Sequence, residues 1–276
     1  MRTDKYGIKI KDDQVESQLP PVSQNELFSR EDISWWFIYR AELICLLMEK
    51  YFSKDDITYD IGGGNGYSSN EARKRGFNIG LIEPAYDGCV HAHMRGIENI
   101  ICGAFTDTLF EDASIKQMLL LDVLEHIEED LAFLKLLNKK CMNDGKVIIT
   151  VPAFNSLWSS EDDFARHFKR YKLKGLKNKA EKAGFTVVYG SYFFSFLYLP
   201  ILFIRHYGEK LGIFKRKDEK NYDEWKKMND REFKSSNKLV LSVLRMFERL
   251  ESERIKRGHR IMFGSSIIMV MKKIDK

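Results

Sequence analysis

Four glycines lie within five consecutive positions, in the stretch DIGGGNG that begins at Asp60. Glycine adopts positive φ angles readily and carries no Cβ, so another molecule can come close to its backbone. The stretch follows a short apolar segment, and the residues after it have helical spacing. In open α/β sheets, ligands bind beyond the carboxyl ends of the strands. We therefore predict that Gly62, Gly64 and Gly66 line a ligand site.

Glu83 is the next residue with clear chemistry, about twenty positions further on and at the end of the following apolar segment. A carboxylate at that place can accept hydrogen bonds from both hydroxyls of an adenosine ribose. The glycines and Glu83 together predict a cofactor that contains a nucleoside.

The glycine spacing separates two classes of such cofactors. A dinucleotide fingerprint reads G-x-G-x-x-G, whereas this loop reads G-x-G-x-G and places Tyr67 at the third fingerprint position. Asp60 would also repel a pyrophosphate, but it suits a cationic sulfonium cofactor that carries an ammonium group. A nucleotide-dependent oxidoreductase is therefore disfavoured. A glycine-rich turn that serves only the fold is the remaining alternative.

Groups suited to proton transfer gather one hundred residues later. They are Trp158, Glu161, Asp162, Asp163, His167, Arg170 and Tyr171. The ordinary pKa of histidine lies near neutrality, which makes His167 the candidate base, with Asp163 as its partner. The alternative is that His167 caps or bridges a loop together with Arg170. His126, which follows Glu125, is expected to fix a turn.

We predict no metal site and no disulfide framework. Four cysteines, Cys45, Cys89, Cys102 and Cys141, are widely scattered without a C-x-x-C pair. This pattern is typical of a reducing cytoplasm. His91 and His93 are two positions apart and do not share a helical face.

Strands and helices are predicted to alternate over residues 57–151. These elements must position the glycine loop, Glu83 and the candidate catalytic side chains. The runs MLLLD and VIITV are continuously apolar, as in parallel strands that are buried on both faces. A further helix over 172–183 and a strand over 185–192 follow, and a closing strand is predicted over 264–273. This alternation is typical of a doubly wound α/β sheet.

The N-terminal region is predicted to be a loosely held arm over 1–28, followed by a helix that begins at the N-cap Ser29. Arg40 falls on the apolar stripe of this helix, where an arginine needs a partner. It either extends to solvent or belongs to a lid helix. In a lid, Trp36 and Tyr39 would cover the cofactor, and Arg40 would meet a carboxylate of the cofactor or of Asp60.

These motifs resemble the class I S-adenosylmethionine-dependent methyltransferases. DIGGGNG is similar to their first motif, and LLLDVLEHIEEDLAFLKLL is similar to the segment around the end of their fourth strand. The stretches EDISWWFIYRAELI, VPAFNSLWSSEDDFARHFKRYKLKGLKNKAEKAGF and FGSSIIMVMKK resemble a quinone-biosynthesis-like subgroup associated with bacterial cell-surface glycan genes. The resemblance spans residues 30–276. It implies a Rossmann-like, mostly parallel sheet of seven strands with helical additions at the N-terminus and between the last two strands.

The resemblance also implies roles for individual residues. The glycines would line the methionine half of S-adenosylmethionine, Asp60 would organise their loop, and Glu83 would hold the ribose. Ala104 and Phe105 would flank the adenine, although the polar residue usual there is missing. Asp122 and Val123 would meet the methionine amino group or the sulfonium. Apart from the resemblance, the residues themselves lead us to expect a cofactor contact from Arg40 and substrate contacts from Trp36, Trp158, Arg170 and Tyr171.

Charge and hydropathy limit the classes of partner that the protein can have. The net charge is +5, and residues 205–260 hold seventeen Lys and Arg against ten Asp and Glu. The apolar run 192–204 is too short to cross a bilayer, which takes about 20 residues. A buried strand and helix would explain this run. A cation-flanked contact with a membrane surface through 192–220 is the alternative. Interleaved acids argue against nucleic acid as a partner.

The sequence thus predicts a cytoplasmic S-adenosylmethionine-dependent methyltransferase, with membrane association left open. It would act on an O or N atom of a small molecule, a sugar or a lipid-linked glycan, and would release S-adenosylhomocysteine. A catalytically inactive cofactor-binding scaffold is the alternative. We expect four segments: an arm and lid helix (1–52), a cofactor-binding core (53–194), a basic helical insertion (195–260) and a closing strand (261–276).

Overall fold

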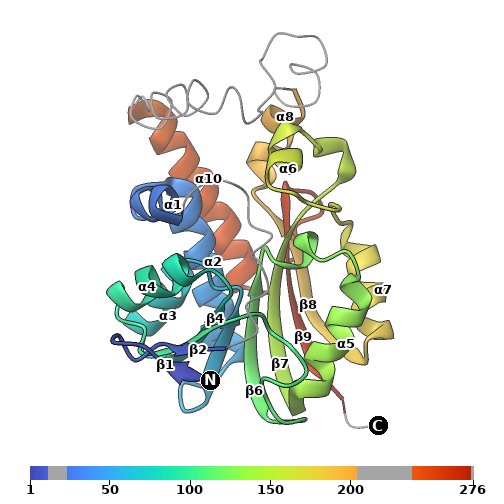
Figure 1. The fold of residues 1–276 in the computed structure, drawn as a ribbon. Coiled ribbons are helices and arrows are strands. Elements are labelled where there is room, and N and C mark those ends of the chain that lie inside the picture. Colours follow the sequence, from blue (N-terminus) through green and yellow to red (C-terminus); the bar gives the residue numbers. More distant parts are fainter. Residues whose placement is uncertain (12–23, 204–237, 275–276) are drawn as a thin grey trace.

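Apolar strands form one mixed sheet through the middle of the molecule (Figure 1). The computed structural model describes residues 1–11, 24–203 and 238–274. The strands are β1 (Arg2–Thr3), β2 (Lys9–Ile10), β3 (Ile57–Ile61), β4 (Asn78–Glu83), β5 (Asn99–Cys102), β6 (Ile115–Leu121), β7 (Cys141–Pro152), β8 (Phe185–Phe193) and β9 (Ser266–Lys273). Their spatial order is β1-β2-β5-β4-β3-β6-β7-β9-β8.

Strands β3 to β7 are parallel to their neighbours among themselves, whereas β9 runs antiparallel to both β7 and β8. The carboxyl ends of the parallel strands therefore meet at one edge, which is the upper edge in Figure 1. The side chains of β6 and β7 that lie in the middle of the sheet are fully buried. This confirms the predicted Rossmann-like α/β fold.

The predicted count of seven strands is wrong, because the part of the chain that the structure describes contributes nine. The two additional strands, β1 and β2, belong to the segment predicted to be a loose arm. The Asp4 carboxylate accepts hydrogen bonds from the amides of Tyr6 and Ile8, which fixes the turn between them. Ile8 is 1% exposed and packs in the core. Its burial explains why this short hairpin pairs with β5 at the sheet edge.

Helices cover both faces of the sheet (Figure 1). They are α1 (Gln24–Glu31), α2 (Trp35–Tyr51), α3 (Tyr67–Lys74), α4 (Tyr86–Met94), α5 (Asp130–Lys140), α6 (Ser160–Phe164), α7 (Leu173–Lys182), α8 (Tyr198–Ile201) and α10 (Lys238–Lys256). Three short 3₁₀ turns are η1 (Leu124–His126), η2 (Asn155–Leu157) and η3 (Ser195–Leu197). One apolar layer joins the sheet to α2, α3, α4 and α10, and the other joins it to α5 and α7.

The predicted helix from Ser29 to Tyr51 is two helices. Ser29 lies inside α1, and Ser34 is the N-cap of α2, where the backbone is extended. Ile33, between the helices, is 71% exposed. The apolar pattern continues across this break, so periodicity alone predicts one helix.

Helix α10 is joined to the rest of the fold through a buried carboxylate. Glu251 is 3% exposed and accepts hydrogen bonds from the Tyr39 hydroxyl, the Phe194 amide, and the amide and hydroxyl of Ser195. Tyr39 thus faces α10 and the core. Its predicted role as a cover for the cofactor is wrong.

The basic insertion predicted over 195–260 is described only in part, because residues 204–237 lie outside the described ranges. The parts that are described include α8 and α10 and are largely helical. Most of the proposed membrane segment 192–220 also lies outside them. Within the described chain, no helix combines the length and the apolar character needed to cross a membrane.

We expect Glu251→Ala to lower the free energy of unfolding by about 3 kcal/mol, because it leaves several buried donors without an acceptor. Glu253→Ala is the matched control: Glu253 is exposed on the same helix and pairs only at the surface with Arg257, so its loss should change stability by less than about 0.5 kcal/mol. Urea unfolding of both variants measures the difference. Equal losses would contradict the anchoring role of Glu251.

Candidate active site

The glycine loop follows β3 and is shaped by close contacts within the protein. Gly62 and Gly66 have φ angles of 72° and 73°. A Cβ on Gly62 would lie 2.6 Å from Val123 Cγ2, and a Cβ on Gly66 would lie 2.9 Å from Ala92 Cβ. These two glycines are therefore required by the packing of the loop on its neighbours.

Gly64 differs from them. Its φ is 54°, yet no atom of the described chain lies within 4 Å of a Cβ built on it. Packing within the described protein therefore does not explain this glycine. Its positive φ favours glycine, and the open space beside it leaves room for a ligand to approach the backbone.

Glu83, at the end of β4, is bonded to this loop. Its Oε2 accepts the Gly64 amide at 2.9 Å, and its Oε1 accepts the Ala85 amide at 2.8 Å. The side chain is buried, and this burial raises the pKa of the carboxyl to about 7 despite the two backbone hydrogen bonds. Each oxygen keeps a further acceptor position, which is what a ribose hydroxyl would use.

Asp60 lies beneath the loop at the end of β3. Its Oδ2 accepts the Ser69 hydroxyl at 2.8 Å, while its buried Oδ1 has no hydrogen-bond partner in the described chain. Burial raises the pKa of this carboxyl to about 6. The hydrogen bond to Ser69, at the start of α3, agrees with the predicted role of Asp60 in ordering the loop.

Arg40 is held by Asp122, the first residue after β6. Asp122 adopts a left-handed backbone conformation with φ 55°. Its Oδ2 forms an ion pair with the Arg40 guanidinium, and its Oδ1 accepts the Thr150 hydroxyl at 2.9 Å. Asp60, the protein partner that we predicted for Arg40, is not the residue it contacts. The Arg40 Nε is buried and has no hydrogen-bond partner within the described residues.

Trp36 lies beside Arg40 on α2. The Arg40 guanidinium lies over the Trp36 ring at 5.0 Å, and this ring stacks on Phe194 at 5.6 Å. Helix α2 therefore brings one aromatic ring and one cation to the end of β6. A role of Trp36 in substrate binding remains a prediction.

The segment after β5 supplies an apolar contact. Phe105 is 8% exposed and packs against Phe110 and Phe133, with ring centroids 6.0 and 6.1 Å apart. Ala104 precedes it and is half-buried. An adenine at this position would meet an aromatic layer, as the resemblance implies.

Asp162 organises the segment after β7. Ser159 and Asp162 form a capping box at the start of α6. The second carboxylate oxygen of Asp162 accepts the His167 Nδ1–H at 2.8 Å and the Arg170 Nε–H at 2.7 Å. Burial alone would raise the pKa of Asp162, but the His167 and Arg170 contacts lower it below its usual range. The ionised carboxylate can only accept, so His167 donates from Nδ1, and the lone pair of the neutral ring lies on Nε2.

The predicted partner of His167 was Asp163, and this is wrong. Asp163 Oδ1 accepts the Trp158 Nε1–H at 2.9 Å. The S-x-x-D spacing from Ser159 to Asp162 points to Asp162 instead. It is typical of a capping box, in which the side chain at the third helical position turns back toward the helix start.

Two predicted substrate contacts are buried and already bonded. Arg170 is 6% exposed in its side chain and also donates to the Ala153 carbonyl. Tyr171 is 4% exposed, and its hydroxyl donates toward Asp130 Oδ2 and the Leu124 carbonyl. We correct both assignments: these side chains support the loop. The alternative in which His167 and Arg170 bridge a loop is therefore observed, through Asp162.

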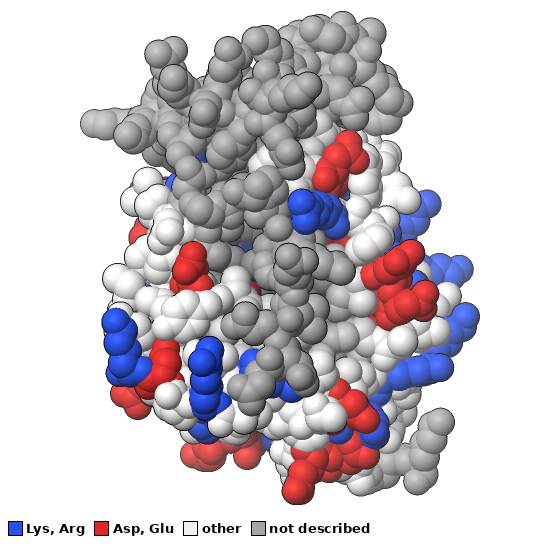
Figure 2. Space-filling model, in the orientation of Figure 1, with Lys and Arg blue, Asp and Glu red and all other residues white. Residues whose placement is uncertain are grey.

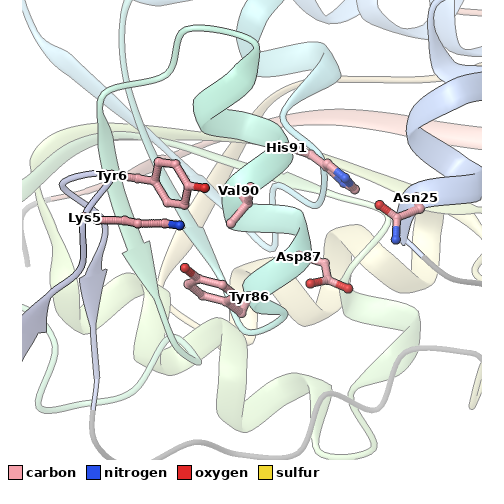
Figure 3. Close-up of a pocket in the computed structure, with 7 residues that line it drawn as sticks. All are labelled: Lys5, Tyr6, Asn25, Tyr86, Asp87, Val90 and His91. Carbon is pink, nitrogen blue, oxygen red and sulfur yellow. The ribbon is translucent and has the colours of Figure 1, made fainter.

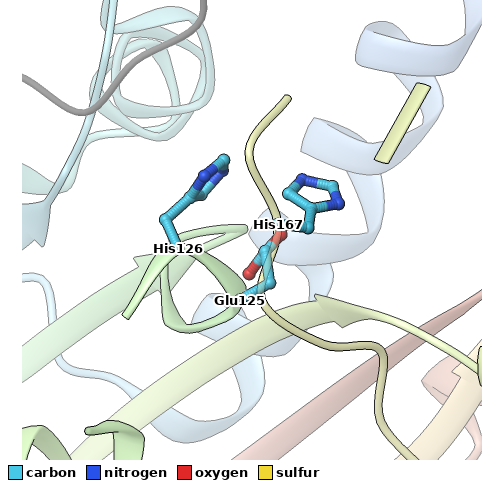
Figure 4. A group of neighbouring side chains, drawn as sticks. All are labelled: Glu125, His126 and His167. Carbon is cyan, nitrogen blue, oxygen red and sulfur yellow. The ribbon is translucent and has the colours of Figure 1, made fainter. Parts of the chain in front are cut away.

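Glu125 and His126 lie against His167 (Figure 4). The rings of His126 and His167 are 4.7 Å apart at 72°. Burial raises the pKa of Glu125 well above its usual range, and burial and the neighbouring His167 lower the pKa of His126 to about 4. This juxtaposition was missed, because forty residues separate the two segments and neither contains a metal-binding pattern.

A separate depression of about 290 Å³ lies between the N-terminal hairpin, α1 and α4 (Figure 3). Its lining consists of Lys5, Tyr6, Asn25, Tyr86, Asp87, Val90 and His91. None of the predicted site residues belongs to it.

Comparisons with known proteins place this geometry in context. A sequence profile described as a methyltransferase domain matches residues 27–189. No curated protein matches the chain. The fold is similar to that of Haemonchus contortus phosphoethanolamine N-methyltransferase 2 in complex with S-adenosyl-L-methionine, with 13% identity, TM-score 0.55, and coverage of 92% of this chain and 58% of that one.

Two further solved structures show the same fold. A SAM-dependent methyltransferase from Archaeoglobus fulgidus has 19% identity, TM-score 0.50, and coverage of 87% of this chain and 100% of that one. The [4+2]-cyclase SpnF has 12% identity, TM-score 0.55, and coverage of 95% and 90%. These likenesses concern the fold, and the profile match extends over more than half of the chain. The chain therefore belongs to the methyltransferase domain family.

Proposed function

We propose that the protein transfers the methyl group of S-adenosylmethionine to an O or N atom of a small molecule, a sugar or a lipid-linked glycan. The observation that carries this proposal is the Gly64 loop: the Gly64 amide is bonded to Glu83, and Asp60, at the end of the preceding strand, has a buried Oδ1 without a hydrogen-bond partner in the described chain. S-adenosylmethionine is the cofactor, and it supplies an electrophilic methyl group whose sulfur departs as a neutral thioether.

The chain would provide a contact for each part of this cofactor. Glu83 would accept the ribose hydroxyls, and the open face of Gly64 would receive the neighbouring atoms. The aromatic layer at Phe105 would contact the adenine. Asp122 and Val123, beyond β6, would lie near the methionine amino group. Arg40 would favour the methionine carboxylate, since its ion pair with Asp122 already holds it at that end of the sheet.

His167 would orient the acceptor or accept its proton. Asp162 holds the Nδ1–H, so the lone pair on Nε2 is the one that can take a proton. Its side chain is 16% exposed, whereas Asp162 is buried behind it. Asp162 would keep the ring in one tautomer and one orientation, the task that we had assigned to Asp163.

Exposed apolar side chains support an acceptor with a lipid part. Leu199 and Phe203 in and after α8 are 57% and 63% exposed, and Phe263 before β9 is 51% exposed. Helix α8 lies at the end of the sheet that carries the carboxyl ends of the strands (Figure 1), and β9 begins at the same end, where Ser266 pairs with Pro152. On the face seen in Figure 2, the described Lys and Arg side chains are interspersed with Asp and Glu. This mixture favours a small or lipid-linked acceptor over nucleic acid.

The resemblance to the quinone-biosynthesis-like subgroup supports the same acceptor classes. A cofactor-binding scaffold without turnover is the second candidate. The likeness to a cyclase favours keeping it, because the same fold serves a protein whose name describes another reaction.

Calorimetric titration with S-adenosylhomocysteine tests the cofactor assignment first. We expect binding with Kd in the micromolar range, on the order of −8 kcal/mol, and no heat with NADH or NADPH. Dinucleotide binding would overturn the interpretation of the glycine spacing. Cofactor binding without methyl transfer to nucleotide sugars or lipid-linked glycans would favour the scaffold.

Substitution of single glycines separates binding from folding. Gly64→Ala should weaken S-adenosylhomocysteine binding about tenfold or more while costing only about 1 kcal/mol of stability, the strain of a left-handed alanine. Gly66→Ala should mainly destabilise the fold, since its Cβ meets Ala92. Calorimetry and urea unfolding of both variants provide the comparison. Unchanged affinity in a folded Gly64→Ala protein would remove Gly64 from the site.

His167→Asn should lower the rate of methyl transfer about 10²-fold through loss of the Nε2 lone pair. Affinity for S-adenosylhomocysteine should stay within about twofold, because His167 lies on the acceptor side. A radiolabelled methyl-transfer assay with the acceptor found by screening measures the rate. An unchanged rate would exclude His167 from the reaction.

A further inference from the structure

Three potential ligand side chains converge beside the turn after β6. One ligand atom from each of Glu125, His126 and His167 lies within 4.8 Å of the other two (Figure 4). Glu125 and His126 come from η1, and His167 comes from the segment after α6. No residue of this group belongs to the predicted cofactor contacts.

Two of these side chains present buried atoms that are otherwise unused. Glu125 is 1% exposed, and its Oε2 has no hydrogen-bond partner in the described part of the chain. The Nδ1 atom of His126 is also buried and has no hydrogen-bond partner among the described residues. The third side chain, His167, donates its Nδ1–H to Asp162, so Nε2 of the neutral ring carries the lone pair that could bind an ion. Buried polar atoms normally have partners, so two such atoms on side chains that lie beside His167 call for an occupant.

We propose that Glu125, His126 and His167 bind a divalent transition-metal ion of the zinc class. Two imidazoles and one carboxylate are a donor set that catalytic zinc sites use, with a fourth position left open. Ligand atoms in a tetrahedral zinc site are about 3.3 Å apart, given bonds of about 2.0–2.1 Å. The three ligand atoms lie within 4.8 Å of one another, so an ion would have to draw them closer together. This proposal departs from our expectation of no metal site.

One of these ligands is oriented as metal sites require: Asp162 holds the His167 ring through Nδ1. Such outer partners fix the tautomer and direction of a metal-binding histidine. Asp162 is itself held by the Ser159 amide and by Arg170.

The two segments are also fixed relative to each other. The Phe168 amide donates to the Glu125 carbonyl at 2.8 Å, next to His167 in the chain. This hydrogen bond joins the backbone of one ligand segment directly to the other. The three side chains can therefore meet without a large movement of the loop.

The role of the ion rests on the proposed methyl transfer. Its open position would hold an acceptor hydroxyl and lower the pKa of that hydroxyl, so that the oxygen is the nucleophile and its proton passes to water. His167 Nε2 would then be occupied by the ion and could not serve as the base. The metal site and a metal-free His167 base are thus distinct states of one side chain.

Cobalt spectroscopy on the full-length protein tests the site without an acceptor. After treatment with chelator and dialysis, the protein is titrated with Co²⁺, and the visible d–d absorption is recorded. Zn²⁺ is then added, and bound metal is counted by mass spectrometry. We expect one ion per chain, intense bands of four- or five-coordinate Co²⁺, and loss of these bands on addition of Zn²⁺.

The variants Glu125→Gln, His126→Ala and His167→Ala should each lose the Co²⁺ bands at the same free Co²⁺ concentration. Asp162→Asn should weaken binding about 10- to 100-fold. His259→Ala is the control, because His259 is exposed and lies outside the group. Wild-type protein without bands, or bands that persist in both His126→Ala and His167→Ala, would overturn the proposal.

Titration with S-adenosylhomocysteine shows whether each variant is folded, since the cofactor contacts are separate from the three ligands. Retained cofactor binding together with lost Co²⁺ binding supports the site. Retained cofactor binding in a wild-type protein that takes up no metal would refute the metal site while leaving the proposed function intact. If the wild-type protein does not bind the cofactor, that result would instead contradict the proposed function.

Discussion

The hydrogen bond from the Gly64 amide to the Glu83 carboxylate is the constraint on which the cofactor half of the structure depends. It joins the turn after β3 to the end of the neighbouring strand β4. Gly62 and Gly66 allow the turn to lie close to Val123 and Ala92, so its path is fixed on both sides. Glu83 is held at the same time by the Ala85 amide at the start of α4. The loop is therefore in place before any ligand arrives, which lowers the entropy lost on binding.

This arrangement concentrates negative charge that has little compensation within the described chain. Burial raises the pKa values of Asp60 and Glu83 to about 6 and about 7. Ionising either carboxyl therefore costs folding free energy. A cofactor with a sulfonium and an ammonium group would offset part of that cost, whereas a pyrophosphate would add to it. The electrostatics of the buried acids thus lead to the same class of cofactor as the glycine spacing does.

The sequence predicts correctly those parts of the structure that depend on local pattern. The continuous apolar runs located β6 and β7, and the glycines located the turn after β3. It failed where partners are distant in the chain or where adjacent residues compete. Asp162 and Asp163 are neighbours of identical type, and only the capping geometry selects the one that faces His167. Arg40 was recognised as needing a carboxylate, but the choice of Asp122 depends on how α2 crosses the sheet.

The N-terminal hairpin and the cluster around Glu125 illustrate the same limit. The sequence around Ile8 and Ile10 contains too few apolar residues to predict a strand. The strand forms because β2 pairs with β5 at the edge of the sheet. Glu125, His126 and His167 acquire their chemistry only when the loop after α6 docks on η1.

The residues on the acceptor side therefore determine which reaction occurs, because the fold alone does not. Likeness to methyltransferases and to a cyclase shows that one sheet can hold different chemistries, so the reaction depends on groups beyond the carboxyl ends of the strands. In the proposed site, a single lone pair, on Nε2 of the neutral His167 ring, would serve either a proton or a metal ion. Asp162 makes that lone pair available in both cases, because it keeps the proton of the ring on Nδ1. Glu125 and His126 then favour the ion, since a lone base would not need a second imidazole and a buried carboxylate turned toward it.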